Sequence, residues 1–169
     1  MSQHDILFKH QHGFRSKLST ETQLTEFIGN MKEGMKDRIQ HNVVVMDFAK
    51  AFGKVSHYKL IFKLKKYGID EITCGWAESF LHNRSQRVVV DGAQTDVGLV
   101  TLGLPQGSFI GPILFLIYMN DMPDYIKHSN IRLFAIDTII YLTVTGQSDS
   151  HKLQEDLTSL EKWGVRLAD

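Results

Sequence analysis

Two aspartates in this chain interrupt segments that otherwise have the composition of buried β-strands. Asp47 lies near the end of the β-branched run 42–48, and Asp137 lies inside the apolar stretch 133–140. A buried carboxylate is costly unless it is paired, protonated or bound to a metal. Asp47 is therefore either a strand-end cap or a metal ligand or base. Asp137 is a bend residue, a structural carboxylate satisfied by its neighbours, or half of a chemical site. If both point the same way from neighbouring strands, they form an oxygen-donor pair of the kind that holds Mg²⁺.

A glycine- and proline-rich loop at residues 103–112 is the next candidate. Its sequence, GLPQGSFIGP, predicts a constrained turn before a helix. Ser108 and the backbone N–H groups of Gln106 and Gly107 could form an anion-binding nest there. A tight strand-to-helix connection explains the same residues, and no Gly-Lys-Ser/Thr follows, so the loop is not a P-loop. Phe52, five residues after Asp47, is either a core residue or a ring that faces a substrate.

Composition sets broad limits on the protein class. The 169 residues fit one domain, and 43% hydrophobic with 22% charged residues is ordinary for a globular protein. Nineteen basic and nineteen acidic residues cancel, so the net charge does not by itself indicate a nucleic-acid binder. The single cysteine, Cys74, excludes an internal disulfide framework and a cysteine-based zinc cluster. The absence of a long apolar run and of a signal-peptide pattern predicts a soluble, intracellular chain with no membrane segment.

The elements that must position these residues alternate between helical and strand-like segments. Apolar periodicity and turn signals predict helices over residues 19–40, 57–69, 70–82, 113–122 and 148–163. Strands are predicted over 42–48, over two runs within 84–102 and over 131–144. The Asp91-Gly92 pair predicts a hairpin between the two runs, and a bend is expected at Asp137–Thr138 within a single strand. The connections suggest antiparallel pairing and an α+β class.

Taken in order, several of these segments resemble reverse transcriptases of non-LTR (LINE-type) retrotransposons. The similar segments extend from Gln11 to Trp163: QHGFR, STETQL, MDFAKAFGKVSH, KLKKYGI, SFLHNRSQRVVVDG, GLPQGSFIGPILFLIYMNDM, RLFAIDTIIYL and LQEDLTSLEKW. The resemblance implies a partial polymerase palm, an antiparallel sheet backed by helices, over residues 41–169. It also implies a remnant of the fingers over residues 1–40. Earlier fingers segments and the thumb are expected to be missing, so the domain is interpreted as truncated.

The resemblance further implies RNA-directed DNA synthesis, with an RNA template, a DNA primer and dNTPs as partners. Two Mg²⁺ ions would activate the primer 3′-hydroxyl and neutralise the triphosphate. Carried over by position, Asp47 is the metal ligand of the first catalytic motif and the carbonyl of Phe48 is a lesser ligand. Asp137 matches the second aspartate of the other catalytic motif, and is assigned to catalysis and to metal binding.

Four further positions are assigned to substrate binding by the same resemblance. Phe52 falls where the family places a ring that screens the sugar 2′ position. Gln106 and Gly107 would lie beside the templating base pair, and Arg15 is a candidate for a phosphate contact.

The chain departs from the family pattern at one catalytic position. The family has Phe-Ala-Asp-Asp where this chain has Phe-Ala-Ile-Asp, so Ile136 replaces the first aspartate of the pair. An isoleucine side chain offers Mg²⁺ no oxygen, and strand alternation is expected to point Asp137 to the face opposite Ile136. Loss of polymerase activity is therefore predicted. Gly53, where the family often has aspartate, is a milder departure. The alternatives are a non-catalytic nucleic-acid-binding palm relic and a translated pseudogene fragment.

Overall fold

The protein was analysed as a computed structural model, which describes residues 6–36 and 39–168. The chain divides into two compact units. The first runs to Ala49 and resumes over Met119–Leu167, and the second is Lys50–Tyr118. The mixture of helices with antiparallel strands confirms the predicted α+β class.

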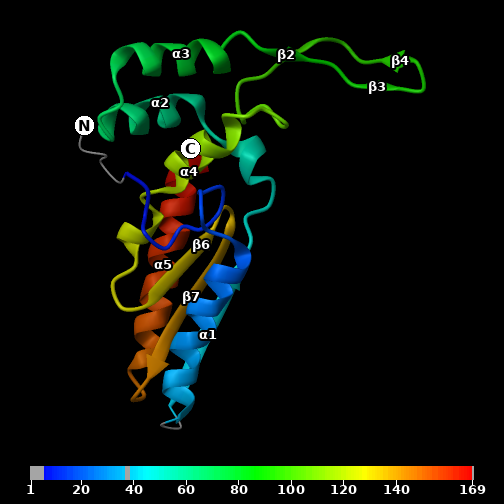
Figure 1. Cartoon of the computed structure of the whole chain (residues 1–169). Coiled ribbons are helices and arrows are strands. Elements are labelled where there is room, and N and C mark those ends of the chain that lie inside the picture. Colours follow the sequence, from blue (N-terminus) through cyan, green and yellow to red (C-terminus); the bar gives the residue numbers. More distant parts are fainter. Residues whose placement is uncertain (1–5, 37–38, 169) are drawn as a thin grey trace. The chain divides into compact units, whose positions relative to one another are not determined.

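The first unit is built on a three-stranded antiparallel sheet in the order β1-β7-β6 (Figure 1). These strands are β1 Gln40–Met46, β6 Asn130–Phe134 and β7 Asp137–Val144. The β1–β7 register runs from Gln40 opposite Val144 to Met46 opposite Thr138. β-Branched side chains are common in these strands, which suits a pleated surface with at least one buried face.

One face of this sheet is buried and lies toward α5, Asp149–Ala168. Thr138 and Ile140 on this face have no exposed surface. The ring of Phe48, just beyond β1, meets Trp163 of α5 edge-on with ring centres 6.2 Å apart. The carboxylate of Asp156, also on α5, accepts hydrogen bonds from the backbone N–H groups of residues 127–129, immediately before β6. The apolar side of α5 thus closes the core of the unit.

The opposite face carries α1, Thr20–Lys36. Phe27 meets Tyr141 of β7 edge-on at 5.4 Å between ring centres, and Asn30 donates to the Tyr141 hydroxyl at 2.7 Å. Figure 1 shows α1 and α5 on either side of β6 and β7. The predicted helix 19–40 extends too far, because Gln40 already belongs to β1; residues 37 and 38 lie outside the described part.

The second unit contains two amphipathic helices and one apolar helix. α2 is His57–Lys66 and α3 is Glu71–Leu81; they pack together, with Ser56 and Asp70 as their N-cap residues. α4 is Gly111–Met119, and its side chains are buried almost all round. Short 3₁₀ turns occur at Ala51–Lys54 (η1), in this unit, and at Met122–Tyr125 (η2), in the first unit. None of the helices within residues 6–36 and 39–168 combines the length and apolar character needed to cross a membrane.

A narrow β-ribbon follows α3 (Figure 1). Its strands are β2 Ser85–Gln86, β3 Val89–Val90, β4 Ala93–Gln94 and β5 Gly98–Leu99, paired as β2 with β5 and β3 with β4. Asp91 and Gly92 link β3 to β4 with φ values of 49° and 80°. Positive φ at both central residues is the geometry that two-residue hairpins favour. The predicted Asp91-Gly92 hairpin is confirmed.

The segment 131–144 is not the single bent strand that its composition predicts. β6 ends at Phe134, β7 begins at Asp137, and these two residues are paired, so Ala135 and Ile136 form a two-residue turn. Ala135 has φ 55°, a left-handed conformation that a residue with a Cβ seldom adopts. The prediction placed the break two residues too late because an Ala-Ile pair carries none of the usual turn residues.

Candidate active site

The two candidate carboxylates lie at the same end of the sheet. The last cross-strand pair of β1 and β7 is Met46 with Thr138. Asp47 directly follows Met46 in the chain, and Asp137 directly precedes Thr138. Extending the register by one residue places Asp47 opposite Asp137. Both residues are exposed to solvent. Directly opposed residues share a face of a sheet, so the topology brings these two carboxylates to one edge of the first unit.

Ile136 lies in the turn itself and not in a strand. The expectation that strand alternation sends Asp137 to the face opposite Ile136 is therefore wrong, because alternation applies only within regular strands. Ile136 occupies the second position of the β6–β7 turn, adjacent to Asp137. A carboxylate at this position would stand at the tip of the hairpin, beside the pair formed by Asp47 and Asp137.

The turn is held from outside by Gln11, a residue to which the sequence assigned no role. The Gln11 side-chain oxygen accepts from the N–H groups of Gly13 at 2.9 Å and Ala135 at 2.8 Å, and its NH₂ donates to the Ala135 carbonyl at 3.4 Å. Gln11 is only 2% exposed. The backbone beside it also pairs with β6, through His12 N–H to Leu133 O and Leu133 N–H to His10 O. The pattern Gln-His-Gly contains no sequence feature that predicts this contact.

A partly buried cluster of ionisable side chains joins that same segment to α1 and β6. Arg132 is 6% exposed and pairs with Glu26 of α1, and its guanidinium lies 2.9 Å from the His10 ring. His12 Nε2 lies 3.7 Å from Glu26, and its Nδ1 is hydrogen-bonded to Thr22. Burial, followed by the charge of Arg132, lowers the pKa of His10. These contacts anchor the segment that carries Gln11.

Arg15 has two backbone partners in this structure. Its Nη1 donates to the carbonyl oxygens of Phe8 at 3.1 Å and Gln11 at 3.4 Å. These bonds close the loop of residues 8–15. A phosphate contact by Arg15 stays a prediction.

In the second unit, the segment after the first catalytic motif meets the glycine-rich loop. The N–H of Leu104 donates to Phe52 O at 2.9 Å, and the N–H of Gly103 donates to Val55 O at 2.8 Å. Gly103 has φ +86°, and a Cβ there would lie 2.9 Å from the backbone oxygen of Gly53. A side chain at position 103 would therefore separate the two segments.

The ring of Phe52 has a defined packing partner. It stacks on Phe115 of α4 with ring centres 4.2 Å apart and an interplanar angle of 14°, and Phe115 is fully buried. Phe52 itself is half-buried. One face of the Phe52 ring therefore packs against the core. The predicted role of Phe52 in screening the sugar 2′ position stays a prediction.

Gln106 and Gly107 are exposed at the tip of the loop. The hydroxyl of Ser108 donates to Pro105 O at 2.7 Å and accepts from the Gly111 N–H at 3.1 Å, just where α4 begins. The hydroxyl therefore both donates and accepts a hydrogen bond within the turn. This agrees with the interpretation of the loop as a tight strand-to-helix connection. Contact of Gln106 and Gly107 with a templating base pair stays a prediction.

The donor set expected at the sheet edge contains one carboxylate fewer than the family pattern. Among residues 6–36 and 39–168, no group of three or more His, Cys, Asp or Glu side chains is arranged to hold a metal. Asp47, Asp137 and the Phe48 carbonyl are the expected ligands, and Ile136 contributes none. Mg²⁺ requires hard oxygen ligands in near-octahedral geometry.

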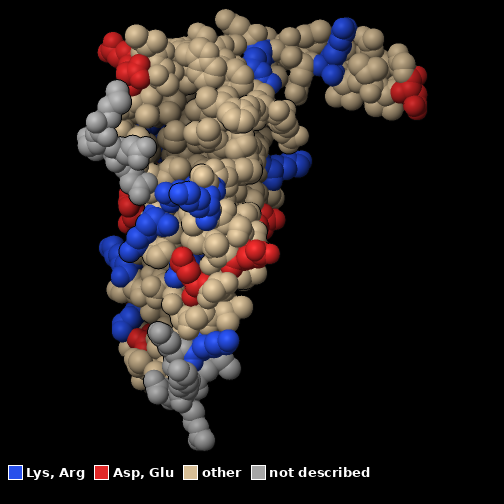
Figure 2. Space-filling view, viewed as in Figure 1, with Lys and Arg blue, Asp and Glu red and all other residues tan. Residues whose placement is uncertain are grey.

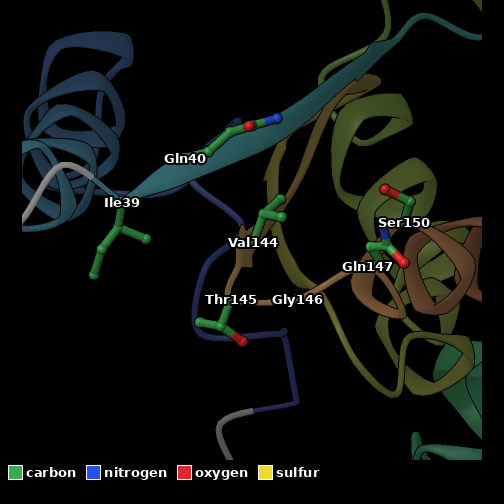
Figure 3. Close-up of a pocket in the computed structure, with 7 residues that line it drawn as sticks. All are labelled: Ile39, Gln40, Val144, Thr145, Gly146, Gln147 and Ser150. Atoms are coloured by element: carbon green, nitrogen blue, oxygen red, sulfur yellow. The ribbon is translucent and has the colours of Figure 1, made fainter.

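A cavity of about 630 Å³ lies at the other end of the same strand pair. It is bordered by residues 39–40 at the start of β1, residues 144–147 after β7, and Ser150 of α5 (Figure 3). The neighbouring Asp149 carboxylate already accepts from Thr145 and Gly146 N–H and pairs with Lys152. Because Gln40 is six residues from Met46, this cavity is separate from the aspartate pair.

The model of the reverse transcriptase (RNA-dependent DNA polymerase) family matches residues 1–168. This chain belongs to the reverse transcriptase family. The RNA-directed DNA polymerase from mobile element jockey of Drosophila melanogaster is 29% identical over 164 residues, which cover 92% of this chain and 18% of that protein. The probable RNA-directed DNA polymerase from transposon BS of the same species is 29% identical over 180 residues, which cover 98% of this chain and 19% of that protein.

A third relative, the probable RNA-directed DNA polymerase from transposon X-element, is 31% identical over 123 residues, 73% of this chain and 13% of that protein. The resemblance of the ordered motifs to reverse transcriptases of non-LTR retrotransposons is confirmed by these matches. The chain spans less than a fifth of the length of these relatives.

Proposed function

We propose that this reverse transcriptase domain is the palm portion of an RNA-directed DNA polymerase whose nucleotidyl transfer is lost at Ile136. In an intact domain the partners would be an RNA template, a DNA primer and dNTPs. The catalytic residues would be Asp47 and Asp137 at the edge of the β1–β7 pair. The observation that carries the proposal is the turn, in which Ile136 stands next to Asp137 and offers no oxygen.

The expected loss of nucleotide-incorporation rate is large. Removing one neutral oxyanion donor from an active site costs roughly 10²–10³ in rate, and a charged metal ligand should contribute at least as much. We therefore expect this chain to incorporate nucleotides at least ~10²-fold more slowly than its Ile136→Asp variant.

Primer extension on an RNA template, with Mg²⁺ or Mn²⁺, tests this expectation. The chain as written should give no template-dependent product, and Ile136→Asp should restore extension. Asp47→Asn in the Ile136→Asp background should abolish it again. Ile72→Asp, which adds the same charge at a position 86% exposed on α3, is the matched control and should have no effect. Clear synthesis by the unaltered chain would refute the proposal.

Metal binding provides a readout that does not depend on primer or template. Mn²⁺ broadens nearby NMR signals, so a titration reports where the ion binds. Ile136→Asp should bind Mn²⁺ at least ~10-fold more tightly than the unaltered chain, with broadening around Asp47 and Asp137. Equal affinity in the two proteins, or broadening centred elsewhere, would contradict the role given to position 136.

A further inference from the structure

The β-ribbon of the second unit leaves apolar side chains in contact with solvent. Every residue over 85–99 is exposed. Val88, Val89 and Val90 have exposed fractions of 57%, 55% and 61%. A two-stranded hairpin is marginally stable in water, and three or more strands are needed for independent stability. The ribbon therefore has both the apolar surface and the energetic reason to pair with another strand.

The two edges of the ribbon differ in regularity. Between the cross-strand pairs of β2–β5 and β3–β4, the first strand has two residues, 87–88, whereas the second strand has three, 95–97. The extra residue is a β-bulge in the second strand, and bulges are one of the means by which proteins prevent pairing at an edge. The uninterrupted edge consists of residues 85–90 and is called the open edge.

Hydrogen bonds within the ribbon show which backbone groups of the first strand are already used. The carbonyl oxygens of Arg84 and Val88 accept from N–H groups of the opposite strand at 2.8 Å and 3.0 Å. Alternate residues of a strand direct their backbone groups to opposite sides, so the even-numbered residues bond across the ribbon. The backbone N–H and C=O groups of Arg87 and Val89 therefore point outward, where the described residues place no further strand.

Charges along the open edge favour one register for a second copy of the same edge. Antiparallel pairing about a twofold axis at Val89 places Arg87 opposite Asp91 of the second copy, on both sides of the axis. The same axis places Val88 opposite Val90, so that four valines gather on one face. An axis at Arg87 would instead place two arginines opposite each other, which is destabilising. A second copy centred on Val89 thus complements the open edge in charge and in apolar surface.

We propose that two copies of this chain associate through the open edge, in an antiparallel pairing centred on Val89 that extends the ribbon to four strands. The interface is isologous, as it is in most homodimers. Because the open edge spans only residues 85–90, it buries less than the ~1,000 Å² expected of a stable interface, and the association is therefore weak and dependent on concentration. The pairing uses no residue assigned to nucleotidyl transfer, so it does not rest on the role proposed for Ile136.

Cysteine substitution tests the register directly. In a hydrogen-bonded antiparallel pair the facing Cα atoms lie about 5.5 Å apart, which is within the range of a disulfide. Under mild oxidation, Val89→Cys should form a disulfide-linked dimer at least ~10-fold faster than Arg87→Cys or Val88→Cys. The native Cys74 is buried, and the unaltered chain is the control for its reactivity. Fastest cross-linking at position 87 or 88, or none at all three positions, would overturn the pairing.

Sedimentation equilibrium measures the association without a cross-link. The average mass of the unaltered chain should rise from monomer toward dimer with concentration, and a mass that stays monomeric up to ~1 mM would overturn the proposal. Val89→Pro removes an outward N–H and should weaken the dimer at least ~10-fold. Val97→Pro, on the bulged strand, is the matched control and should change the dissociation constant by less than ~3-fold. Equal effects of the two prolines, in variants that circular dichroism shows to be folded, would refute the assigned edge.

Charge reversal tests the pairing of Arg87 with Asp91. Arg87→Glu places two carboxylates opposite each other on both sides of the axis and should weaken the dimer at least ~10-fold. Adding Asp91→Asn removes that repulsion and retains a favourable turn residue before glycine, so the double variant should dimerise more tightly than Arg87→Glu alone. Lys162→Glu, the same change at an exposed position on α5, should have less than ~3-fold effect. If Lys162→Glu weakens the dimer as much as Arg87→Glu, or if Asp91→Asn gives no recovery, the register is wrong.

Discussion

The side chain of Gln11 is hydrogen-bonded to both the N–H and the C=O of Ala135, 124 residues further along the chain. Ala135 opens the two-residue turn that leads into Asp137. A left-handed backbone conformation at a non-glycine residue persists only when its surroundings hold it, and Gln11 supplies part of that restraint. The geometry of the candidate active site thus depends on a segment that contributes no catalytic residue of its own.

Replacing Gln11 by leucine should destabilise the first unit. The N–H groups of Gly13 and Ala135 would lose their acceptor inside the protein, at about 1–3 kcal/mol for each buried group. Urea denaturation followed by circular dichroism measures the change. Gln154→Leu, at an exposed position on α5, should leave the free energy of unfolding within about 0.5 kcal/mol. A similar midpoint for both variants would show that the Gln11 contacts contribute little.

Gly13 is predicted to be intolerant of even one methyl group. A Cβ at this position would overlap the Ala135 backbone nitrogen, so Gly13→Ala should cost about 1–3 kcal/mol or more through forced movement of the turn. Gly29→Ala has the opposite expected sign. Gly29 lies inside α1 with open space around it, and alanine should stabilise the helix by about 0.5–1 kcal/mol. Melting temperatures of the two variants on either side of the unaltered protein would verify both signs.

Local patterns in the sequence were sufficient for much of this fold. The Asp91-Gly92 turn carries its conformation in its own residues, and the apolar periodicity of α2, α3 and α5 locates each helix to within a few residues at its start. The relation between Asp47 and Asp137 was harder to predict from the sequence. The residues indicated two strand-associated carboxylates, but not the β1–β7 register, whose last pair, Met46 with Thr138, lies directly beside both of them.

The features that could not be predicted are those set by distant residues. The left-handed Ala135 is maintained by Gln11, and the packing of Phe52 depends on Phe115, 63 residues away. Charge does not mark a candidate site on the surface either, because Lys and Arg side chains are interleaved with Asp and Glu over the face seen in Figure 2.

Asp156 should make stability depend on pH in the acidic range. Burial raises the pKa of this carboxyl, but hydrogen bonds from the backbone N–H groups of residues 127–129 outweigh burial and hold its pKa below the usual aspartate value. Because the folded pKa lies below the unfolded one, its contribution is complete above about pH 4 and is lost as the pH falls further.

Thermal melts between pH 3 and pH 7 measure this dependence. Asp156→Asn should lower stability near neutral pH by about 1–3 kcal/mol and should flatten the acid side of the profile. Glu161→Gln, at an exposed position one turn further along α5, is the control and should retain the shape of the unaltered protein's profile. A steep acid limb that survives in Asp156→Asn would assign the dependence to other carboxylates.

Phe52 is expected to act both in packing and in substrate choice, and the two roles can be separated. Phe52→Val removes the stack on Phe115, which should cost about 0.5–1.5 kcal/mol beyond the lost apolar contact. In the Ile136→Asp background, the smaller side chain should also raise incorporation of ribonucleotides relative to deoxyribonucleotides. Phe52→Tyr retains the ring and should keep the selectivity. If Phe52→Val lowers the melting temperature while the ratio of the two incorporation rates stays constant, the ring has only its structural role against Phe115.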